Sequence, residues 1–311
     1  MTDIITVNGT IAAADLGVTH SHEHILWDYW DLLPSYNHIH DDVAVASAEL
    51  ALFKAAGGGA MVDASTVGIR VDPVKIREVS RRTGVHVVAG TGWYRERLYP
   101  QVVQDRTSEA LADVLVAEIE QGMDGTDVRA GVIGEIGTER YRITPAEERV
   151  FRAAAIASQR TGVSVLTHTT HFGELALEQI ALLTATGLAP EKIIVSHLGD
   201  RHDPEHLLRI AETGVYLSID NIGYQGDGYP EDAVRIANIR TLVERGHRAQ
   251  VVLGTDISTM DALRAGGGRG YGWLLESFVP RLRESGLPGD VVEDLLVHNI
   301  AAALSVTGGA R

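Results

Sequence analysis

Short apolar runs alternate with longer helical patterns eight times along this chain of 311 residues. Most of these runs contain four to eight residues and are apolar throughout, rather than at every second position. This pattern is typical of parallel strands that are covered on both faces. We expect strands at residues 17–22, 59–65, 86–92, 130–137, 164–169, 192–198, 215–220 and 250–256.

The segments between these runs carry helix signals. Asp72 precedes Pro73 as an expected N-cap, and Thr144, Pro145 and Glu147 resemble a capping box. We expect helices at residues 41–56, 73–83, 108–122, 145–161, 173–186, 204–213, 231–245 and 271–285. Eight strand-then-helix units with right-handed crossovers leave two architectures, a closed barrel and an open doubly wound sheet.

The end of the first strand favours the closed barrel. An open sheet of this kind would carry a Gly-rich phosphate-binding loop at that point, whereas this chain has His22, Glu23 and His24. No linker or low-complexity segment divides the sequence. We therefore predict a single α/β domain over residues 1–311, a (β/α)8 TIM barrel with its active site at the C-terminal ends of the strands.

Composition limits the partners and the kinds of site. The formal net charge of -15 disfavours nucleic acid and anionic membrane surfaces, so we expect neither as a partner. The chain has no cysteine, and any metal site must therefore use Asp, Glu and the 13 His. We find neither a signal peptide nor an apolar run long enough to span a membrane, and we expect a cytoplasmic protein.

Metal-ligating residue types stand at the ends of five of the predicted strands. In the first of them, side-chain alternation points both histidines of the His-Glu-His segment to the same face. The six residues are His22, His24, Glu135, His168, His197 and Asp256. One such histidine alone would favour a hydrogen-bonded core residue, but six together favour a metal site.

The sequence at these strand ends resembles the phosphotriesterase family of the amidohydrolase superfamily. Order and spacing agree over nearly the whole chain, and Glu on strand four is similar to the phosphotriesterase homology branch. The resemblance rests on residues 17–24 (GVTHSHEH), 134–138 (GEIGT), 167–169 (THT), 196–197 (SH) and 255–256 (TD).

This resemblance implies two divalent metal ions per chain. Glu135 would bridge them, in place of the carboxylated lysine that many phosphotriesterases use. His22, His24 and Asp256 would hold the more buried ion, and His168 and His197 the more exposed one. We expect zinc, although such ligands also suit Mn, Co or Fe. The family further suggests a homodimer.

Two ions would lower the pKa of a shared water and provide a hydroxide nucleophile at neutral pH. Asp256 would then take a proton and pass it to the leaving group. Asp200 matches a relay aspartate of the family, whereas Asn221 stands where some relatives have a relay histidine, so it either binds substrate or caps its loop. Tyr94 either donates a hydrogen bond to the substrate or packs in its loop, and Trp27 either lines the pocket or packs in the core.

Arginines recur in the loops that follow the predicted strands. Such side chains bind carboxylate and phosphate oxygens well, and they suggest an anionic small-molecule substrate. Arg269 is of special interest because glycines surround it. The alternative is that these arginines pair with loop carboxylates. The loop arginines are Arg70, Arg95, Arg97, Arg140, Arg142, Arg201 and Arg269.

Three functions fit the sequence. The first is a binuclear hydrolase of a lactone or carboxylic ester, with phosphotriester cleavage as a possible side activity. The second is a mononuclear amidohydrolase that acts on an amide or amino-heterocycle, which Glu135 disfavours because such a site needs no bridging carboxylate. The third is a non-catalytic protein that retains its metals for binding, which the complete set of ligands disfavours.

Overall fold

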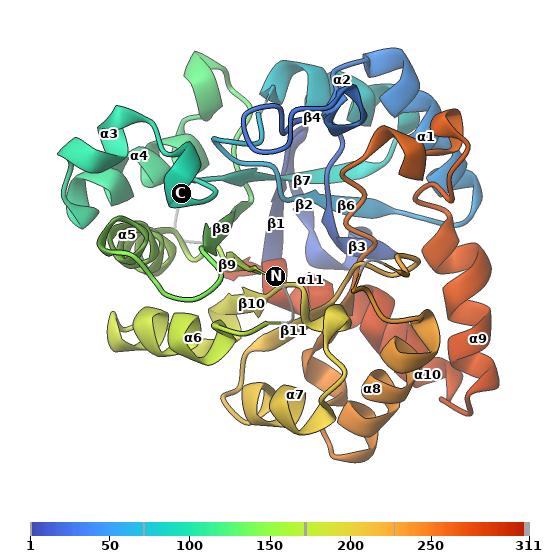
Figure 1. Cartoon of the computed structure of the whole chain (residues 1–311). Helices are drawn as coiled ribbons and strands as arrows, with labels where there is room; N and C mark the ends of the chain where they lie inside the picture. The colour runs from blue at the N-terminus through green and yellow to red at the C-terminus, as the bar shows by residue number, and fades with distance from the viewer. Residues whose placement is uncertain (1, 71, 171–172, 227, 308–311) are drawn as a thin grey trace.

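The computed structural model describes residues 2–70, 72–170, 173–226 and 228–307, and its centre is a barrel of parallel strands (Figure 1). Eight strands pair in the order β12-β11-β10-β9-β8-β7-β6-β3. The predicted (β/α)8 barrel is therefore confirmed. Its strands are β3 (Thr19–Glu23), β6 (Ala60–Asp63), β7 (His86–Thr91), β8 (Val132–Thr138), β9 (Val165–Thr169), β10 (Ile193–Val195), β11 (Tyr216–Ile219) and β12 (Val251–Leu253).

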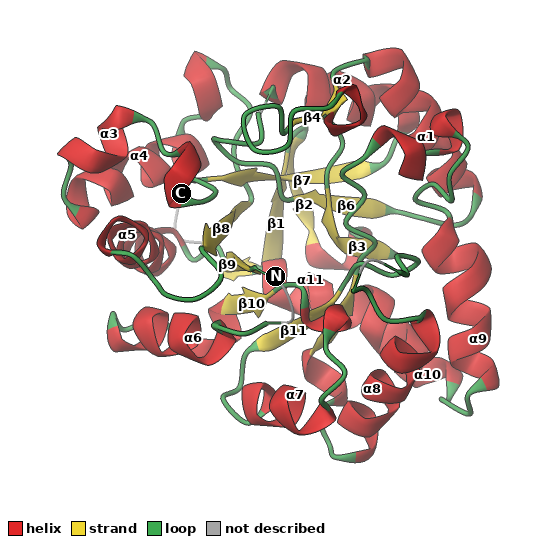
Figure 2. Ribbon diagram, in the orientation of Figure 1, coloured by secondary structure: helices red, strands yellow, loops and turns green. Residues whose placement is uncertain are grey.

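Helices surround the strands, as the red outer ring in Figure 2 shows. Seven predicted helices are observed as α1 (Val43–Ala55), α2 (Pro73–Thr83), α4 (Ser108–Glu120), α5 (Pro145–Thr161), α6 (Ala176–Ala185), α7 (Pro204–Ala211) and α8 (Asp232–Glu244). Asp72 caps α2, and Thr144 with Glu147 forms the expected capping box of α5. The eighth is a π-helical turn, Leu274–Phe278, that continues into α9 (Val279–Glu284).

The structure adds elements that the strand-helix alternation did not predict. A small antiparallel sheet joins β1 (Thr2–Thr6), β2 (Gly9–Ala12) and β13 (Val306–Thr307). It lies at the N-terminal end of the barrel, where the Val7 N–H donates to Val87 O of β7 at 2.9 Å. Further additions include β4 (Trp27–Asp28), β5 (Ile39–His40), α3 (Gln101–Asp105), α10 (Gly289–Glu293) and α11 (Asn299–Leu304). No helix within the described residues is long and apolar enough to cross a membrane.

Alternate strand residues fill the inside of the barrel. Val88, Val132, Leu166 and Ile194 belong to one buried cluster, together with Ile4 of the small sheet. The other strand positions pack outward against the helices in a second and larger cluster. Because both faces of each strand are buried, the strands carry the continuous apolar runs seen in the sequence.

Glu23 lies where the barrel closes, between its first strand, β3, and its last strand, β12. Its fully buried carboxylate accepts hydrogen bonds from the Thr255 N–H and hydroxyl, both at 2.7 Å, and from the Ile257 N–H at 3.1 Å. His20 Nδ1 lies 2.7 Å from the same carboxylate. A single side chain thus holds the C-terminal ends of the first and last barrel strands together.

Glu23→Gln is expected to lower the free energy of unfolding by about 3 kcal/mol, because a buried acceptor of several hydrogen bonds loses its charge and one oxygen. Urea denaturation in excess metal measures the change. Glu284→Gln is the matched control, since that side chain is exposed at the end of α9. An equally small loss in both variants would contradict this role for Glu23.

Candidate metal centre

The six predicted ligands converge at the C-terminal end of the barrel, although they come from five different strand ends. They form three overlapping groups whose nitrogen and oxygen atoms lie within 4.8 Å of one another. The groups are His22, His24 and Glu135; His22, His197 and Asp256; and Glu135, His168 and His197. The structure therefore brings all six residues together in an arrangement that could hold metal ions.

Glu135 stands between the histidines of these groups. Its Oε2 lies 2.9 Å from His168 Nδ1, 3.3 Å from His22 Nε2 and 3.5 Å from His197 Nε2. Its Oε1 lies 3.5 Å from His24 Nε2. One carboxylate thus reaches imidazoles of both expected ion positions, which is the geometry required of a bridging ligand.

Asp256 also approaches the first two histidines. Its Oδ1 is 3.2 Å from His24 Nε2 and 3.5 Å from His22 Nε2. The backbone is left-handed at Asp256, with φ of 49°, and at His197, with φ of 60°. Non-glycine residues in this region carry strain of about 1–3 kcal/mol and concentrate at functional sites. Here the two turns come shortly after the ends of β10 and β12.

Asp220 is a functional residue that the sequence reasoning missed. Its fully buried carboxylate lies behind two of the predicted ligands. Oδ2 accepts from the His197 N–H at 3.0 Å and lies 3.3 Å from His22 Nδ1, while Oδ1 lies 3.2 Å from His197 Nδ1. Such a carboxylate fixes the orientation of the rings and leaves each Nε2 available to an ion. Its position at the end of strand seven was the signal that could have identified it.

Hydroxyl groups contact the rings of His22, in β3, and of His24, directly after it. Ser196 Oγ lies 3.0 Å from His22 Nδ1, and Ser65 Oγ lies 3.0 Å from His24 Nδ1. The buried Tyr29 hydroxyl lies 3.1 Å from His24 Nε2. The two serine contacts join residues distant in sequence, so the local pattern does not predict them.

The donor atoms fit divalent cations. His22 Nε2 is buried and has no hydrogen-bond partner among the described residues, although it faces Glu135 and Asp256. Buried polar atoms are rarely left without a partner. His168 Nδ1 and His197 Nε2 also lie only 2.7 Å apart beside Glu135. Imidazole and carboxylate donors without thiolates suit Zn, Mn, Co or Fe.

The electrostatics of the centre also favour bound positive charge. Burial by itself lowers the pKa of His22, but Asp256 and Glu135 outweigh it and raise that pKa to about 10. Burial raises the pKa of Glu135, yet the charges of His168 and His22 bring it well below its usual range. For Asp220, His197 and His22 likewise outweigh burial and lower the pKa. These buried carboxylates therefore stay ionised and need cations nearby.

Tyr94 lies beside the centre, as its predicted role requires. Its hydroxyl is 3.3 Å from His168 Nε2. Burial and the charge of Glu135 raise the pKa of Tyr94 well above its usual value, so the hydroxyl keeps its proton. A protonated hydroxyl in this position can donate a hydrogen bond to a substrate oxygen.

Asp200 and Asn221 form a second buried layer next to His197. Asn221 Nδ2 donates to Asp200 Oδ2 at 3.0 Å and lies 3.5 Å from His197 Nδ1. Burial raises the pKa of Asp200 to about 7, with partial opposition from His197. Asn221 thus connects the predicted relay carboxylate with a predicted ligand, while the relay role itself stays a prediction.

The two remaining predicted residues, Trp27 and Arg269, stand outside the three groups of candidate ligands. Trp27 is fully buried, and its ring centroid lies 4.8 Å from that of His40. The interpretation of Trp27 as a pocket wall is therefore replaced by packing in the core. The Arg269 guanidinium lies 3.7 Å above the Tyr224 ring, in the loops that follow β11 and β12.

Comparisons with known proteins agree with this site. The model of the phosphotriesterase family matches residues 2–304. The chain is 42% identical to the phosphotriesterase homology protein of Escherichia coli, over 71% of this chain and 75% of that protein. It is 31% identical to the human N-acetyltaurine hydrolase, over 94% of this chain and 95% of that protein.

Similarity to a solved structure extends over the whole barrel. A lactonase from Listeria monocytogenes superposes with a TM-score of 0.92 at 29% identity, covering 98% of this chain and all of the lactonase, 100%. Fold, strand-end residues and family match all lead to the same assignment. The chain belongs to the phosphotriesterase family of the amidohydrolase superfamily and is a metal-dependent hydrolase of that family.

Proposed function

We propose that this chain uses two divalent ions, zinc in the first instance, to hydrolyse a carboxylic ester or lactone of small size. The observation that carries the proposal is the position of Glu135, within 3.5 Å of nitrogen atoms of four histidines. A mononuclear site needs no carboxylate there. The likeness to the Listeria lactonase supports an acyl substrate.

Ions at this centre would supply a nucleophile from water and polarise the substrate carbonyl. Tyr94 would donate its hydroxyl proton in a hydrogen bond to that carbonyl oxygen, beside His168. Asp256 would accept the proton released in the attack and deliver it to the leaving oxygen. Asp220 would keep the rings of His22 and His197 in place throughout.

An amide substrate is a second candidate, because N-acetyltaurine hydrolases are among the relatives of this chain. Amide cleavage requires a proton for the leaving nitrogen. Asp256 would supply this proton, and Asp200, whose burial raises its pKa to about 7 and which Asn221 holds in place by a hydrogen bond, would be a second group able to give up a proton near neutral pH. Ester and amide cleavage therefore call on the same residues and differ in the demand for proton delivery.

Metal-loaded protein is expected to hydrolyse esters or lactones faster than phosphotriesters. Tyr94→Phe is expected to lower kcat by about 10- to 100-fold, because one hydrogen bond to a reacting oxygen is lost. Initial rates on matched lactone, ester, amide and phosphotriester substrates measure both. Because the phenyl ring keeps the packing, the metal content stays unchanged.

Tyr216→Phe is the matched control, since its hydroxyl belongs to the start of β11 at the opposite end of the barrel. If Tyr94→Phe had the same kcat as the parent, the hydroxyl of Tyr94 would have no role in the mechanism. Faster amide than ester cleavage, judged against the spontaneous rates, would favour the second candidate. Hydrolysis of phosphotriesters alone would overturn the acyl assignment.

A further inference from the structure

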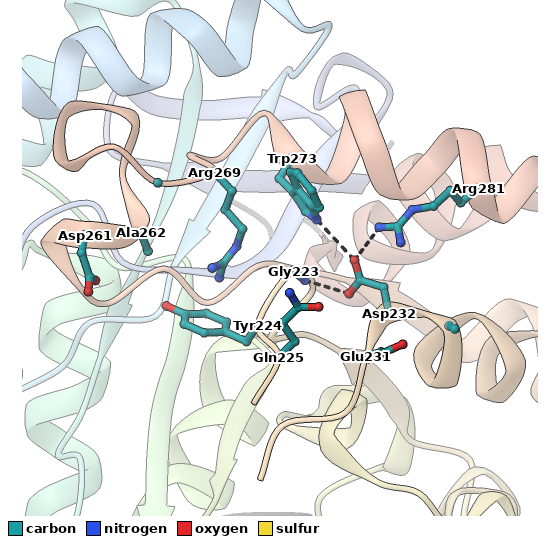
Figure 3. A pocket seen from close by; sticks show the side chains of 12 residues that line it. Gly223, Tyr224, Gln225, Glu231, Asp232, Asp261, Ala262, Arg269, Trp273 and Arg281 are labelled. Atoms are coloured by element: carbon teal, nitrogen blue, oxygen red, sulfur yellow. Dashed lines mark hydrogen bonds and ion pairs between the residues drawn. The ribbon is translucent and has the colours of Figure 1, made fainter. Parts of the chain in front are cut away.

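A cavity of about 430 Å³ lies between the loops that follow β11 and β12 (Figure 3). Tyr224 forms its floor, and Arg269 and Trp273 enter from the other loop. The Tyr224 hydroxyl donates to the backbone oxygen of Asp256 at 3.3 Å. One tyrosine side chain therefore spans the distance between this cavity and a predicted metal ligand.

Arg269 has unused hydrogen-bonding capacity in this cavity. Its guanidinium is stacked 3.7 Å above the Tyr224 ring, and Nε and Nη2 are buried without a hydrogen-bond partner among the described residues. Leaving buried donors unpaired costs about 1–3 kcal/mol each, and more for charged groups. The stacking fixes the plane of the group, so that its N–H edge is presented to a ligand.

Other loop arginines are already paired with carboxylates. Arg70 Nη2 lies 3.1 Å from Asp41, and Arg95 Nη2 lies 3.5 Å from Glu139. Arg140 pairs with Glu174 at 3.5 Å. For these three arginines, the alternative prediction of pairing with loop carboxylates is correct. Arg269 differs from them because its buried Nε and Nη2 have no such partner in the described part of the chain.

Among the residues that the structure describes, no acidic side chain of the cavity forms an ion pair with Arg269. The Asp232 carboxylate accepts hydrogen bonds from the Gly223 N–H at 2.8 Å, from Trp273 Nε1 at 3.3 Å and from Arg281 at 2.6 Å (Figure 3). It also accepts from Arg235 at 3.0 Å. These contacts tie the loop after β11 to the segment that leads into α9. The two other cavity carboxylates, Glu231 and Asp261, are exposed, so water screens their charges.

We propose that Arg269, held on Tyr224, binds a terminal oxyanion of the substrate, such as a carboxylate, while the scissile acyl bond lies at the metal centre. The subsite rests on the proposed function for its acyl group. The favoured substrates are then acyl esters or lactones whose chain ends in a negative charge. Two parallel N–H groups of a guanidinium match two oxygens of one carboxylate.

Matched esters test the subsite. The metal-loaded parent is expected to have a kcat/KM for monomethyl glutarate at least about 10-fold above that for dimethyl glutarate, as expected for one charge-assisted hydrogen-bonded pair. Arg269→Gln should remove this preference, by lowering kcat/KM for the monoester much more than kcat/KM for the neutral diester. Arg269→Lys should keep part of the preference. Arg264→Gln, an exposed arginine of the same loop that pairs with Glu276, is the control.

A binding measurement separates this proposal from the proposed function. Glutarate itself should quench the fluorescence of Trp273, which lines the cavity, in the parent but at least about 10-fold more weakly in Arg269→Gln. Trp273→Phe identifies the responding ring. Glutarate binding that depends on Arg269 without hydrolysis of either ester would support the subsite and contradict the acyl function. The subsite would be overturned if Arg269→Gln lowered kcat/KM for both esters by the same factor. It would also be overturned if the parent and Arg269→Gln bound glutarate with equal affinity.

Discussion

Glu135→Gln is expected to leave at most one divalent ion per chain and to lower kcat/KM by about 1,000-fold or more, because several kcal/mol of metal-derived stabilisation are lost. The physical reason is the position of the carboxylate, which lies 2.9 Å from His168 and 3.3 Å from His22. An amide at this place offers one weak oxygen donor and a nitrogen that carries hydrogens toward the ions.

Elemental analysis and initial rates on the same purified samples measure this effect. Glu118→Gln provides the control, because Glu118 is a largely buried carboxyl on α4 that receives a hydrogen bond from Thr91, outside the metal centre. The control should keep the metal content of the parent. If Glu135→Gln bound two ions and retained its rate, the bridging role of Glu135 would be wrong.

Asp220→Asn is expected to weaken metal binding by about 10- to 100-fold, the usual cost of losing a group that orients a metal-ligating histidine. Asparagine has the same shape, but only one of its two side-chain polar atoms accepts hydrogen bonds. It therefore cannot replace both carboxylate oxygens, which contact His197 and His22. Because the variant loses affinity rather than a ligand, excess metal should restore most of its activity.

Titration of metal-depleted protein with Zn²⁺, followed by rate, separates this positioning role from a catalytic one. The parent and Asp113→Asn, a change in an exposed carboxylate of α4 that pairs with Arg160, should share one titration curve. Asp220→Asn should require more metal and then approach the parent rate. A low rate that excess metal cannot restore would show that Asp220 acts in the reaction itself.

The sequence was sufficient for the barrel and for the six clustered residues because both depend on local order. Each strand is a short apolar run, and each ligand follows the end of one, so a fold that brings strand ends together also brings the ligands together. Asp220 also stands at the end of a predicted strand, so the same argument from strand ends places it near the ligands. Its importance depends on contacts with His22 and His197, which local pattern does not reveal.

The features that were missed depend on contacts between distant segments. Glu23 bonds to Thr255, 232 positions away, and this contact completes the barrel. The small terminal sheet pairs β1 with β13, strands at opposite ends of the described chain. Arg269 was singled out for its glycine neighbours, yet its stacking on Tyr224 required two loops to meet. Contacts between loops depend on tertiary packing, and the pattern of apolar residues in a sequence does not specify that packing.

The metal content of the parent protein tests the central claim most directly. Purified protein reconstituted with Zn²⁺, freed of excess metal and analysed for zinc per chain should contain two ions, and ester hydrolysis should rise until both are bound. A single ion per chain, with full activity and no response to Glu135→Gln, would contradict the binuclear centre.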